Sequence, residues 1–594
     1  MRNDLQPPSE TTRIRSDKAL VLAPHFDDDV FGCGGLLAQL AAARTDVCVL
    51  FLTDGSGGEE PIADRRAYSE RRHGEAVRAL EILGVTEVEF LDLPDGSLVT
   101  HVDEAAEGIR RTLIDRRPDL LLSMSPLERT FDHRAAFAAL YNVLSPLRGG
   151  TELDRAVAGL DILLFGFNHP DYHDVLVDVG GELEQLTRAI KAHASQLELH
   201  NYLEGALGIR SHRALSLPTS VTAAEGFRRL TVNDFVTRSQ SALIRRLGGV
   251  PELLEVHAGP TISVIVRTMD RPDFLNQALA SLAESTYRRF DVVVVNDGGQ
   301  PPAPPEDFPV PLAVVNLPDN RGRAAAANAG IEAATGDWIT FLDDDDLAEP
   351  EHLATLARLA SAAGVRVAYT DTAVGIYELD PESGWREVER RLPFSRDFDP
   401  DLLLFDNYIP FNTLIIDKTA LAEAGPFDVE LPFFEDWDML IRLAALTPFH
   451  HLGQVTAEYR HFRGGGHHIF GEQPGERADF LEMKAKVIAR HRARHTPEIL
   501  AKTVSKLRAE TVAAQEAMTI RTAELEDAYD RLNGERETLA AELESHRTAL
   551  AEQEENVQRL YSEIDRLGNI IDAMEGTKAW RLHRRFEALR GRKR

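Results

Sequence analysis

Short apolar runs alternate with amphipathic stretches over the first 240 residues of the chain. The runs at 47–52, 88–91 and 120–124 predict strands, and residues 69–83 between them have the spacing of a helix. This alternation is typical of domains in which helices cover a parallel sheet. We therefore expect an α/β domain over residues 16–240, and a disordered start over 1–15.

A second α/β pattern begins after a connector at 241–259, where two glycine-containing breakers interrupt the amphipathic pattern. Strands are predicted at 262–266, 291–295 and 338–342, and the proline-rich stretch 301–305 is a loop. The fold class predicted for the chain is therefore α/β, with a second α/β domain over residues 260–495.

The pattern changes again over residues 500–575, where proline disappears and Glu, Ala, Leu and Arg dominate. Apolar residues then recur every seven positions in two series offset by four, which is the a/d pattern of a coiled coil. Polar residues at three positions weaken this seam, and the alternative is a long solvated helix packed on its own domain. The apolar seam residues are Leu525, Leu532, Leu539, Leu543, Leu550, Val557, Leu560, Ile564, Leu567, Ile571 and Met574, and the polar ones are Arg536, His546 and Gln553.

The last stretch, 576–594, is strongly basic and carries Leu582, Phe586 and Leu589 at helical spacing. A basic amphipathic helix can lie on an anionic membrane surface, and a solvated chain end is the equally plain alternative. The coiled coil and this tail suggest two partners, a second copy of the chain and a membrane surface.

Composition narrows the classes of function. The 594 residues are 43% apolar and 27% charged, as in globular proteins, and the net charge of −30 argues against non-specific nucleic-acid binding. Two cysteines, Cys33 and Cys48, form no disulfide framework, which fits a reducing compartment. The chain shows no signal segment and no apolar run of about 18 residues. We expect a cytoplasmic protein, with any membrane contact made peripherally at the inner face.

A cluster of carboxylates follows the predicted strand at 19–23. His25 and Asp28 lie three residues apart on a loop leaving this strand, and His133 follows the strand at 120–124. In parallel sheets the loops at the carboxyl ends of strands hold ligands, and a catalytic zinc needs three protein ligands with one open position. Asp27 would then be free to take the proton from an activated water. The alternative is that these residues merely cap helices or face water.

With these motifs, residues 19 to about 230 resemble the PIG-L/LmbE-like de-N-acetylases, zinc hydrolases with a Rossmann-like fold that remove acetyl from N-acetylglucosaminyl groups. The resemblance implies that His25, Asp28 and His133 bind Zn²⁺ and that Asp27 is the general base. The matching pieces are Pro24-His25-Phe26-Asp27-Asp28, Gly32-Cys33-Gly34-Gly35, Thr53-Asp54-Gly55, Arg72-x-x-Glu75, Asp132-His133-Arg134-Ala135 and Ser195-Gln196.

One departure from this family concerns the oxyanion. Relatives carry a second histidine three residues before the last zinc ligand, where this chain has Thr130. A hydroxyl is a weaker donor than an imidazolium, and the loss of one oxyanion donor costs about a hundredfold in rate. His169 and His173 are the candidates to replace that imidazole.

A second carboxylate cluster, Asp343 to Asp346, follows the predicted strand at 338–342. Mg²⁺ or Mn²⁺ held by one or two such carboxylates stabilises a departing diphosphate. Asp297, after the strand at 291–295, offers a carboxylate for base or ribose hydroxyls, and the acidic stretch 434–438 offers a base. A solvated acidic loop is the alternative for a lone run of this kind.

The order of these pieces over residues 261 to 465 resembles family 2 glycosyltransferases of the GT-A fold. This resemblance implies an inverting transferase that uses a nucleotide-sugar donor, with Asp345 as the main metal ligand, Asp343 or Asp344 as a second one, and Asp436 as base. Met269 stands where relatives often carry an aromatic residue at the nucleobase. The residues expected at the substrate or nucleotide are Thr268, Asp297, Arg321, Asp344, Glu435 and His461.

Three hypotheses follow. The leading one is a bifunctional enzyme that removes acetyl from an amino sugar and transfers a sugar to a saccharide or lipid-linked acceptor. A second, prompted by Thr130, keeps the transferase alone active and makes the first domain a glycan-binding module. A third makes the chain an assembly scaffold built on the coiled coil. Two catalytic clusters in one chain favour the first hypothesis, although fusion by itself does not prove a shared substrate.

Overall fold

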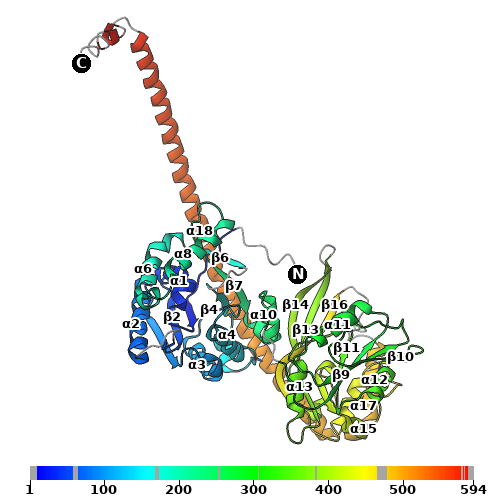
Figure 1. Cartoon of the computed structure of the whole chain (residues 1–594). Helices are drawn as coiled ribbons and strands as arrows, with labels where there is room; N and C mark the ends of the chain where they lie inside the picture. Colours follow the sequence, from blue (N-terminus) through cyan, green and yellow to red (C-terminus); the bar gives the residue numbers. More distant parts are fainter. Residues whose placement is uncertain are drawn as a thin grey trace. The chain divides into compact units, whose positions relative to one another are not determined.

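Two β-sheets covered by helices are followed by one long helix (Figure 1). The chain divides into two units, residues 1–500 and 501–594, and each is treated by itself. Both sheets lie in the first unit. The structure is a computed structural model that describes residues 10–57, 64–167, 173–251, 255–305, 307–380, 384–463, 478–576, 580, 582–585 and 587.

The first sheet has seven strands in the order β3-β2-β1-β4-β5-β7-β6. The first five strands in the chain pair in parallel, and β7 pairs antiparallel with both β5 and β6. The sheet is therefore mixed, where the alternation of strands and helices predicted a parallel one. The strands are β1 (Lys18–Ala23), β2 (Asp46–Thr53), β3 (Glu87–Leu93), β4 (Leu120–Met124), β5 (Asp161–Phe165), β6 (Val175–Asp178) and β7 (Ala224–Thr231).

Helices pack on both faces of this sheet. Val21 of β1 joins the core beneath α1, α2 and α6, whereas Leu20 and Leu22 join the core beneath α3 and α4. This period of two explains why β1 is apolar from Ala19 to Ala23, since a strand covered on both faces has no solvent side. The helices are α1 (Asp28–Ala42), α2 (Arg65–Leu83), α3 (Val102–Arg116), α4 (Phe131–Leu144), α5 (Glu152–Ala156), α6 (Leu183–Ala192), α7 (Ala194–Leu197), α8 (Tyr202–Arg213), α9 (Val232–Thr237) and α10 (Gln240–Arg246).

A buried ion pair forms hydrogen bonds with the backbone groups that a break in α1 leaves unpaired. Cys33 has non-helical backbone angles, φ −141° and ψ 18°, so the helical hydrogen-bond ladder is interrupted there. The Glu225 carboxylate of β7 accepts hydrogen bonds from the amides of Gly35 and Leu36, both at 2.8 Å. Arg210 of α8 donates to the Phe31 carbonyl at 2.9 Å and to Glu225 at 2.6 Å. Backbone groups orphaned by the kink are thus satisfied by one fully buried pair.

The second sheet has nine strands, ordered β10-β9-β8-β11-β15-β13-β16-β12, with β14 paired to β13. Its first four strands are parallel, and β15 runs antiparallel to β11. The predicted strands at 262–266, 291–295 and 338–342 lie within β8, β9 and β11. The strands are β8 (Ile262–Thr268), β9 (Phe290–Asp297), β10 (Leu312–Leu317), β11 (Trp338–Asp343), β12 (Leu347–Ala348), β13 (Val367–Asp380), β14 (Gly384–Phe394), β15 (Leu414–Asp417) and β16 (His450–Arg463).

Helices cover both faces of the second sheet as well. Val264 and Val266 of β8 pack in the core with α11 and α13, and Ile265 packs in the opposite core with α12, α15 and α16. The expected connector 241–259 is partly helical, because α10 continues to Arg246. The helices are α11 (Pro272–Ala283), α12 (Arg323–Ala333), α13 (His352–Ala360), α14 (Pro400–Leu403), α15 (Lys418–Ala424), α16 (Glu435–Leu443) and α17 (Ala478–Arg490).

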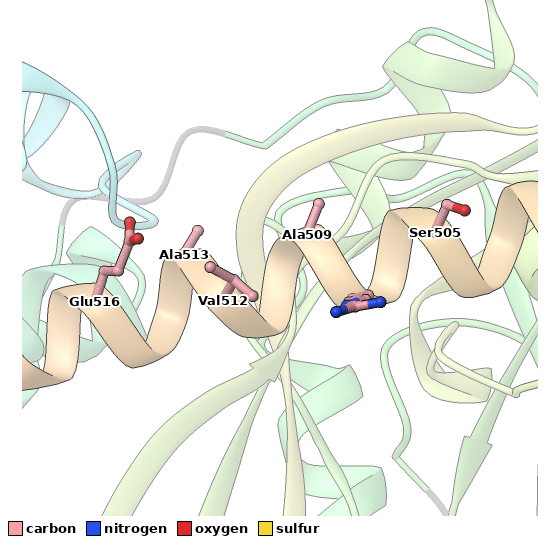
Figure 2. Close-up of a pocket in the computed structure, with 6 residues that line it drawn as sticks. Ser505, Ala509, Val512, Ala513 and Glu516 are labelled. Carbon is pink, nitrogen blue, oxygen red and sulfur yellow. The ribbon is translucent and has the colours of Figure 1, made fainter.

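The last helix, α18 (Pro497–Gly576), is 80 residues long and covers the stretch in which the heptad pattern predicts a helix. Every residue from 536 to 574 is exposed. A shallow hollow on it is lined by residues of α18 alone, and Figure 2 labels five of them, from Ser505 to Glu516. The predicted basic tail lies largely outside the described residues. None of the described helices carries an apolar stretch long enough to cross a membrane.

The ion pair at the α1 kink generates a stability prediction. Replacing Arg210 by Met leaves the buried Glu225 charge uncompensated, so we expect the first domain to lose about 3–5 kcal/mol of unfolding free energy. Urea unfolding followed by far-UV circular dichroism measures this loss. The four tryptophans all lie at or after Trp338, so their fluorescence reports the other parts of the chain and should not change.

Two controls accompany this variant. Arg110→Met breaks an exposed pair with Glu107 and should leave the transition where it was. Combining Arg210→Met with Glu225→Gln should cost less than the two single changes added together, because no lone charge remains. If the double variant loses as much unfolding free energy as the two single variants together, the ion pair does not have the proposed stabilising role.

Candidate active sites

The three predicted zinc ligands converge at the carboxyl ends of β1 and β4. The Nδ1 atom of His25 lies 3.2 Å from the Nε2 atom of His133. The two carboxylate oxygens of Asp28 each lie 3.1 Å from one of these nitrogens. All three ligand atoms fall within 4.8 Å of one another. His25 leaves β1, Asp28 starts α1, and His133 lies in the first turn of α4, so the order of strands in the sheet creates this cluster.

Carboxylates contact the far side of both imidazoles. The His25 Nε2 atom lies 3.3 Å from Asp95 and 3.4 Å from Asp132, and the His133 Nδ1 atom lies 3.4 Å from Glu128. Such partners fix the tautomer and the ring orientation of a metal-binding histidine. Asp132 is itself held by the amides of residues 96 and 98, at 2.7 and 3.0 Å. Sequence reasoning did not assign a role to Asp95 or Glu128.

The donor set fits Zn²⁺. Two imidazoles and one carboxylate with an open fourth position are the ligands of catalytic zinc sites. Burial by itself would lower the pKa of His133, but the charge and hydrogen bond of Asp28 raise it to about 9. The pKa of Asp28 is held well below its usual range, against the effect of burial, by His133 and His25. A buried carboxylate that attracts two protonated imidazoles provides a strong field for a divalent cation.

Asp27 lies beside this cluster with Arg72 as its partner. Arg72 Nη2 is 3.5 Å from Asp27, and Arg72 Nη1 contacts Asp95 at 3.3 Å and the Gly55 carbonyl at 3.0 Å. Burial raises the pKa of Asp27, while the charge of Arg72 opposes the rise. Asp27 is therefore a buried carboxylate of increased basicity whose orientation is set by a fixed cation, as a general base requires.

The residue at the position of the missing imidazole acts as a helix cap. The Thr130 hydroxyl accepts a hydrogen bond from the His133 amide at 3.4 Å, at the N-terminus of α4. His169 lies outside the described residues. His173 is described, and burial together with Arg213 and Arg228 lowers its pKa to about 3, so its imidazole is neutral. Replacement of the missing donor by either histidine stays a prediction.

A cavity of about 1020 Å³ opens at the carboxyl end of the parallel strands β8, β9 and β11. It brings together most of the residues that the second cluster predicts. Arg321 and Asp344 are not among the described lining residues: Arg321 donates its amide to Asp297 at 2.8 Å, and Asp344 is fully buried. The predicted residues that line the cavity are Thr268, Asp297, Asp343, Asp345, Glu435, Asp436 and His461.

Arginines compensate the aspartates of this cavity, which sequence reasoning missed. Asp343 accepts from Arg267 Nη2 at 2.6 Å on one oxygen and from Arg323 Nη2 at 2.7 Å on the other. Burial would raise the pKa of Asp343, but these two cations hold it well below its usual range. Arg271 contacts Asp344 at 3.0 Å and Asp345 at 2.9 Å. Side chains from three elements therefore fix the carboxylates in place.

The four consecutive aspartates differ in their surroundings. Burial raises the pKa of Asp344 to about 7 and that of Asp346 well above its usual range. Asp346 accepts from Asn412 at 2.9 Å, and Asp344 from Thr268 at 2.7 Å, so both carboxylates are hydrogen-bonded to neighbouring side chains. Asp343, Asp345 and Asp346 line the cavity, and one or two such carboxylates fit Mg²⁺ or Mn²⁺, which complete their shell with water and phosphate.

The proposed base of the transferase begins α16. Phe434, just before it, has a positive φ of 63°, a strained conformation for a residue with a large side chain. This turn places Glu435 and Asp436 at the helix N-terminus, where Asn407 donates to Asp436 at 3.1 Å. Burial first, and then the charge of Glu435, raise the pKa of Asp436 to about 6, while Arg323 opposes this.

Comparison with known proteins gives a match for each of the two domains. Residues 20–144 match the family model for PIG-L, GlcNAc-PI de-N-acetylase, and residues 263–418 match glycosyl transferase family 2. The diacetylchitobiose deacetylase of Thermococcus kodakarensis is 33% identical over 189 residues, which are 30% of this chain and 70% of that protein. The uncharacterized glycosyltransferase YwdF of Bacillus subtilis is 31% identical over 187 residues, which are 31% of this chain and 68% of that protein.

A mycobacterial protein gives a further match. The PGL/p-HBAD biosynthesis glycosyltransferase of Mycobacterium bovis is 29% identical over 223 residues, which are 35% of this chain and 79% of that protein. The chain belongs to both families: it is a fusion of a PIG-L deacetylase domain and a family 2 glycosyltransferase domain. The two resemblances drawn from the motifs are thereby confirmed.

The carboxylate behind His133 generates a prediction on metal affinity. Glu128→Gln weakens the acceptor that orients the His133 ring, so we expect zinc affinity to fall about 10–100-fold. Competition with a chromogenic chelator measures this affinity without any assay of activity. Glu107→Gln, on the exposed face of α3, is the matched control and should bind zinc as the unaltered chain does. Equal affinity in both variants would show that Glu128 does not support the ligand.

Proposed function

We propose that the chain is a bifunctional enzyme of glycan modification. One domain hydrolyses the N-acetyl group of an amino sugar, and the other transfers a sugar from a nucleotide donor with inversion. The observation that carries the first activity is the convergence of His25, Asp28 and His133 next to Asp27. The second activity is supported by a cavity that holds Asp343, Asp345 and Asp436 together.

In the deacetylase domain, His25, Asp28 and His133 would hold Zn²⁺. The ion supplies Lewis acidity, which lowers the pKa of water and polarises the amide carbonyl. Asp27 accepts the proton of the attacking water and then returns it to the leaving nitrogen, so acetate and a free amine are the products. Arg72 keeps Asp27 in place for both transfers. A relative named diacetylchitobiose deacetylase supports an N-acetylated amino sugar as substrate.

In the transferase domain, Asp345 and Asp343 would hold Mg²⁺ or Mn²⁺. When bound, the cation would supply positive charge that stabilises the diphosphate of the donor as a leaving group. Asp436 removes the proton from the acceptor hydroxyl, which attacks the anomeric carbon from the face opposite the leaving group, so the configuration inverts. Arg271 and Arg323 line the same cavity and add positive charge beside the diphosphate. Asp297 and His461 also line it, and we assign them to the nucleotide and the diphosphate.

The acceptor is a glycan or a glycolipid in this proposal, and the enzyme works at the cytoplasmic face of the membrane. The basic tail of the sequence supports such a location, because clustered Lys and Arg residues are attracted to anionic lipids. An overall charge of −30 keeps the rest of the chain away from that surface.

One observation favours the alternative in which only the transferase is active. Thr130 caps α4 with its hydroxyl oxygen, and the hydroxyl proton that it could still donate is a weaker donor to an oxyanion than an imidazolium. The first domain would then bind a glycan without hydrolysing it. Acetate release from an N-acetylated chitooligosaccharide by the full chain, blocked by a zinc chelator, excludes this alternative.

Independent active sites generate the first functional prediction. Asp28→Ala removes a metal ligand, so zinc content and acetate release should fall to background while sugar transfer is unchanged. Asp345→Ala should abolish transfer, screened with a panel of nucleotide sugars and Mn²⁺, and spare acetate release. Loss of both activities in one variant that keeps its circular dichroism spectrum would refute two separate sites.

The pKa of Asp436 generates a pH prediction. The base acts only when ionised, so kcat/KM for transfer should fall as the pH drops below about 6. Glu435→Gln removes a charge that raises the pKa of Asp436, so this acidic limb should move to lower pH. Arg323→Met removes a charge that lowers it, so the limb should move to higher pH.

We expect each displacement to be about 1 pH unit, as is usual for a charge within a few ångströms. Glu332→Gln, at an exposed position on the same helix as Arg323, is the control and should leave the profile unchanged. If the pH profiles of Glu435→Gln and Arg323→Met move in the same direction, Asp436 is not the base.

A further inference from the structure

We propose that residues 536–574 of α18 form a parallel, two-stranded coiled coil with a second copy of this chain. Nine of the eleven apolar residues of the predicted heptad pattern lie in this stretch and form the contact, and from here on the seam means these nine. The inference rests on α18 alone and does not depend on either catalytic activity. The seam consists of Leu539, Leu543, Leu550, Val557, Leu560, Ile564, Leu567, Ile571 and Met574.

The seam is uncovered within one copy of the chain. Its nine side chains are between 46% and 64% exposed, although each is a residue type that proteins usually bury. A large contiguous apolar surface of this kind marks an interaction site. Isolated helices gain most of their stability from packing of an apolar face, so a helix of 80 residues needs a partner along this stripe.

The spacing of the seam identifies the partner as another helix. Its residues follow each other at alternating steps of three and four, with two polar interruptions, so they form a narrow stripe with the 3.5-residue period of a coiled coil. A membrane surface fits poorly, because residues 536–574 carry nine acidic and four basic side chains. A second copy of α18 presents the same stripe.

The residue types at the seam favour two parallel strands. Val557, Ile564 and Ile571 occupy one heptad position, a, and Leu560 and Leu567 occupy the other, d. β-Branched residues at a combined with Leu at d are the arrangement of parallel dimers, whereas Ile at d favours three or four strands. The uninterrupted run from 557 to 574 is therefore the core of the proposed dimer.

Charges beside the seam agree with the parallel register. In a parallel pair, the residue before position a faces the residue five positions later on the partner helix. Glu542 then faces the partner's Arg547, once on each side of the dimer. Within one chain, Arg547 lies 3.9 Å from Glu544, and both side chains are exposed. Replacing this weak contact by the one to Glu542 across the dimer therefore costs little free energy. From 535 to 568, no such pair brings together two like charges.

Polar positions lie toward the N-terminal end of the stripe. Gln553 and His546 fall at d, and Arg536 falls at a. In an in-register parallel dimer each polar residue meets its own copy, and such layers fix register at a cost in stability. The register is thus defined by these layers, while most of the affinity comes from residues 557–574.

A dimer would also hold two copies of each active site on one particle, which increases avidity for a repeating glycan.

The oligomeric state tests the proposal directly. Light scattering of the full chain after size-exclusion chromatography should give twice the chain mass of 65.9 kDa. The variant Ile564→Glu with Ile571→Glu places charge in the seam and should give the mass of one chain. Ser562→Glu with Asn569→Glu adds the same charge on the opposite face of the same turns and should stay dimeric.

The mass distinguishes the outcomes. A single-chain mass for the unaltered protein, or equal disruption by both double variants, would overturn the proposal, and a mass of three or four chains would overturn the two-stranded arrangement. Far-UV circular dichroism of the full chain checks that the two double variants have the same helix content, so that a difference in mass is not due to unfolding.

Orientation is tested with single cysteines at the two ends of the seam. Leu543→Cys and Met574→Cys should each give a reducible dimer under mild oxidation, because every seam position meets itself in a parallel pair. An antiparallel pair brings a position together with itself only at its centre, so crosslinking at neither end would overturn the parallel arrangement. The native cysteines, Cys33 and Cys48, are buried and remain as an internal control.

Discussion

The burial of neighbouring carboxylates is the constraint on which both active sites depend. Each domain places consecutive aspartates at the end of a strand in surroundings that disfavour charge. Left alone, such groups would take up protons and lose their affinity for cations. In the first domain His25, His133 and Arg72 supply the opposing charge. In the second domain Arg267, Arg271 and Arg323 do so.

The two domains solve this problem differently, and the difference follows from their chemistry. The deacetylase compensates Asp28 with imidazoles, which can lose a proton and bind a metal instead. The transferase compensates Asp343 with guanidinium groups, which keep their charge at any pH in the physiological range. An enzyme that handles a diphosphate benefits from permanent cations, whereas a hydrolase built on zinc needs ligands that can give up their protons.

Irregular backbone close to each site holds these carboxylates in place. The kink at Cys33 separates the first turn of α1, with Asp28, from the rest of the helix, and the pair of Arg210 and Glu225 satisfies the groups that the kink exposes. In the other domain the strained turn at Phe434 starts α16 at the point where Asp436 reaches the cavity. Irregular backbone thus occurs beside both sites, as is common where geometry serves function.

Local patterns of apolar residues were sufficient to predict the strands β1 and β11 and the helical nature of α18. A buried strand or helix face leaves such a pattern in residues that are close in the sequence. The acidic clusters directly follow the two predicted strands. Motifs extended this prediction to His133 and Asp436. The antiparallel strand β7, the carboxylates of Asp95 and Glu128, and the arginines around Asp343 became evident only from the tertiary structure. Their partners lie dozens of residues away in several cases, and such contacts depend on strand order and loop path, which no local pattern records.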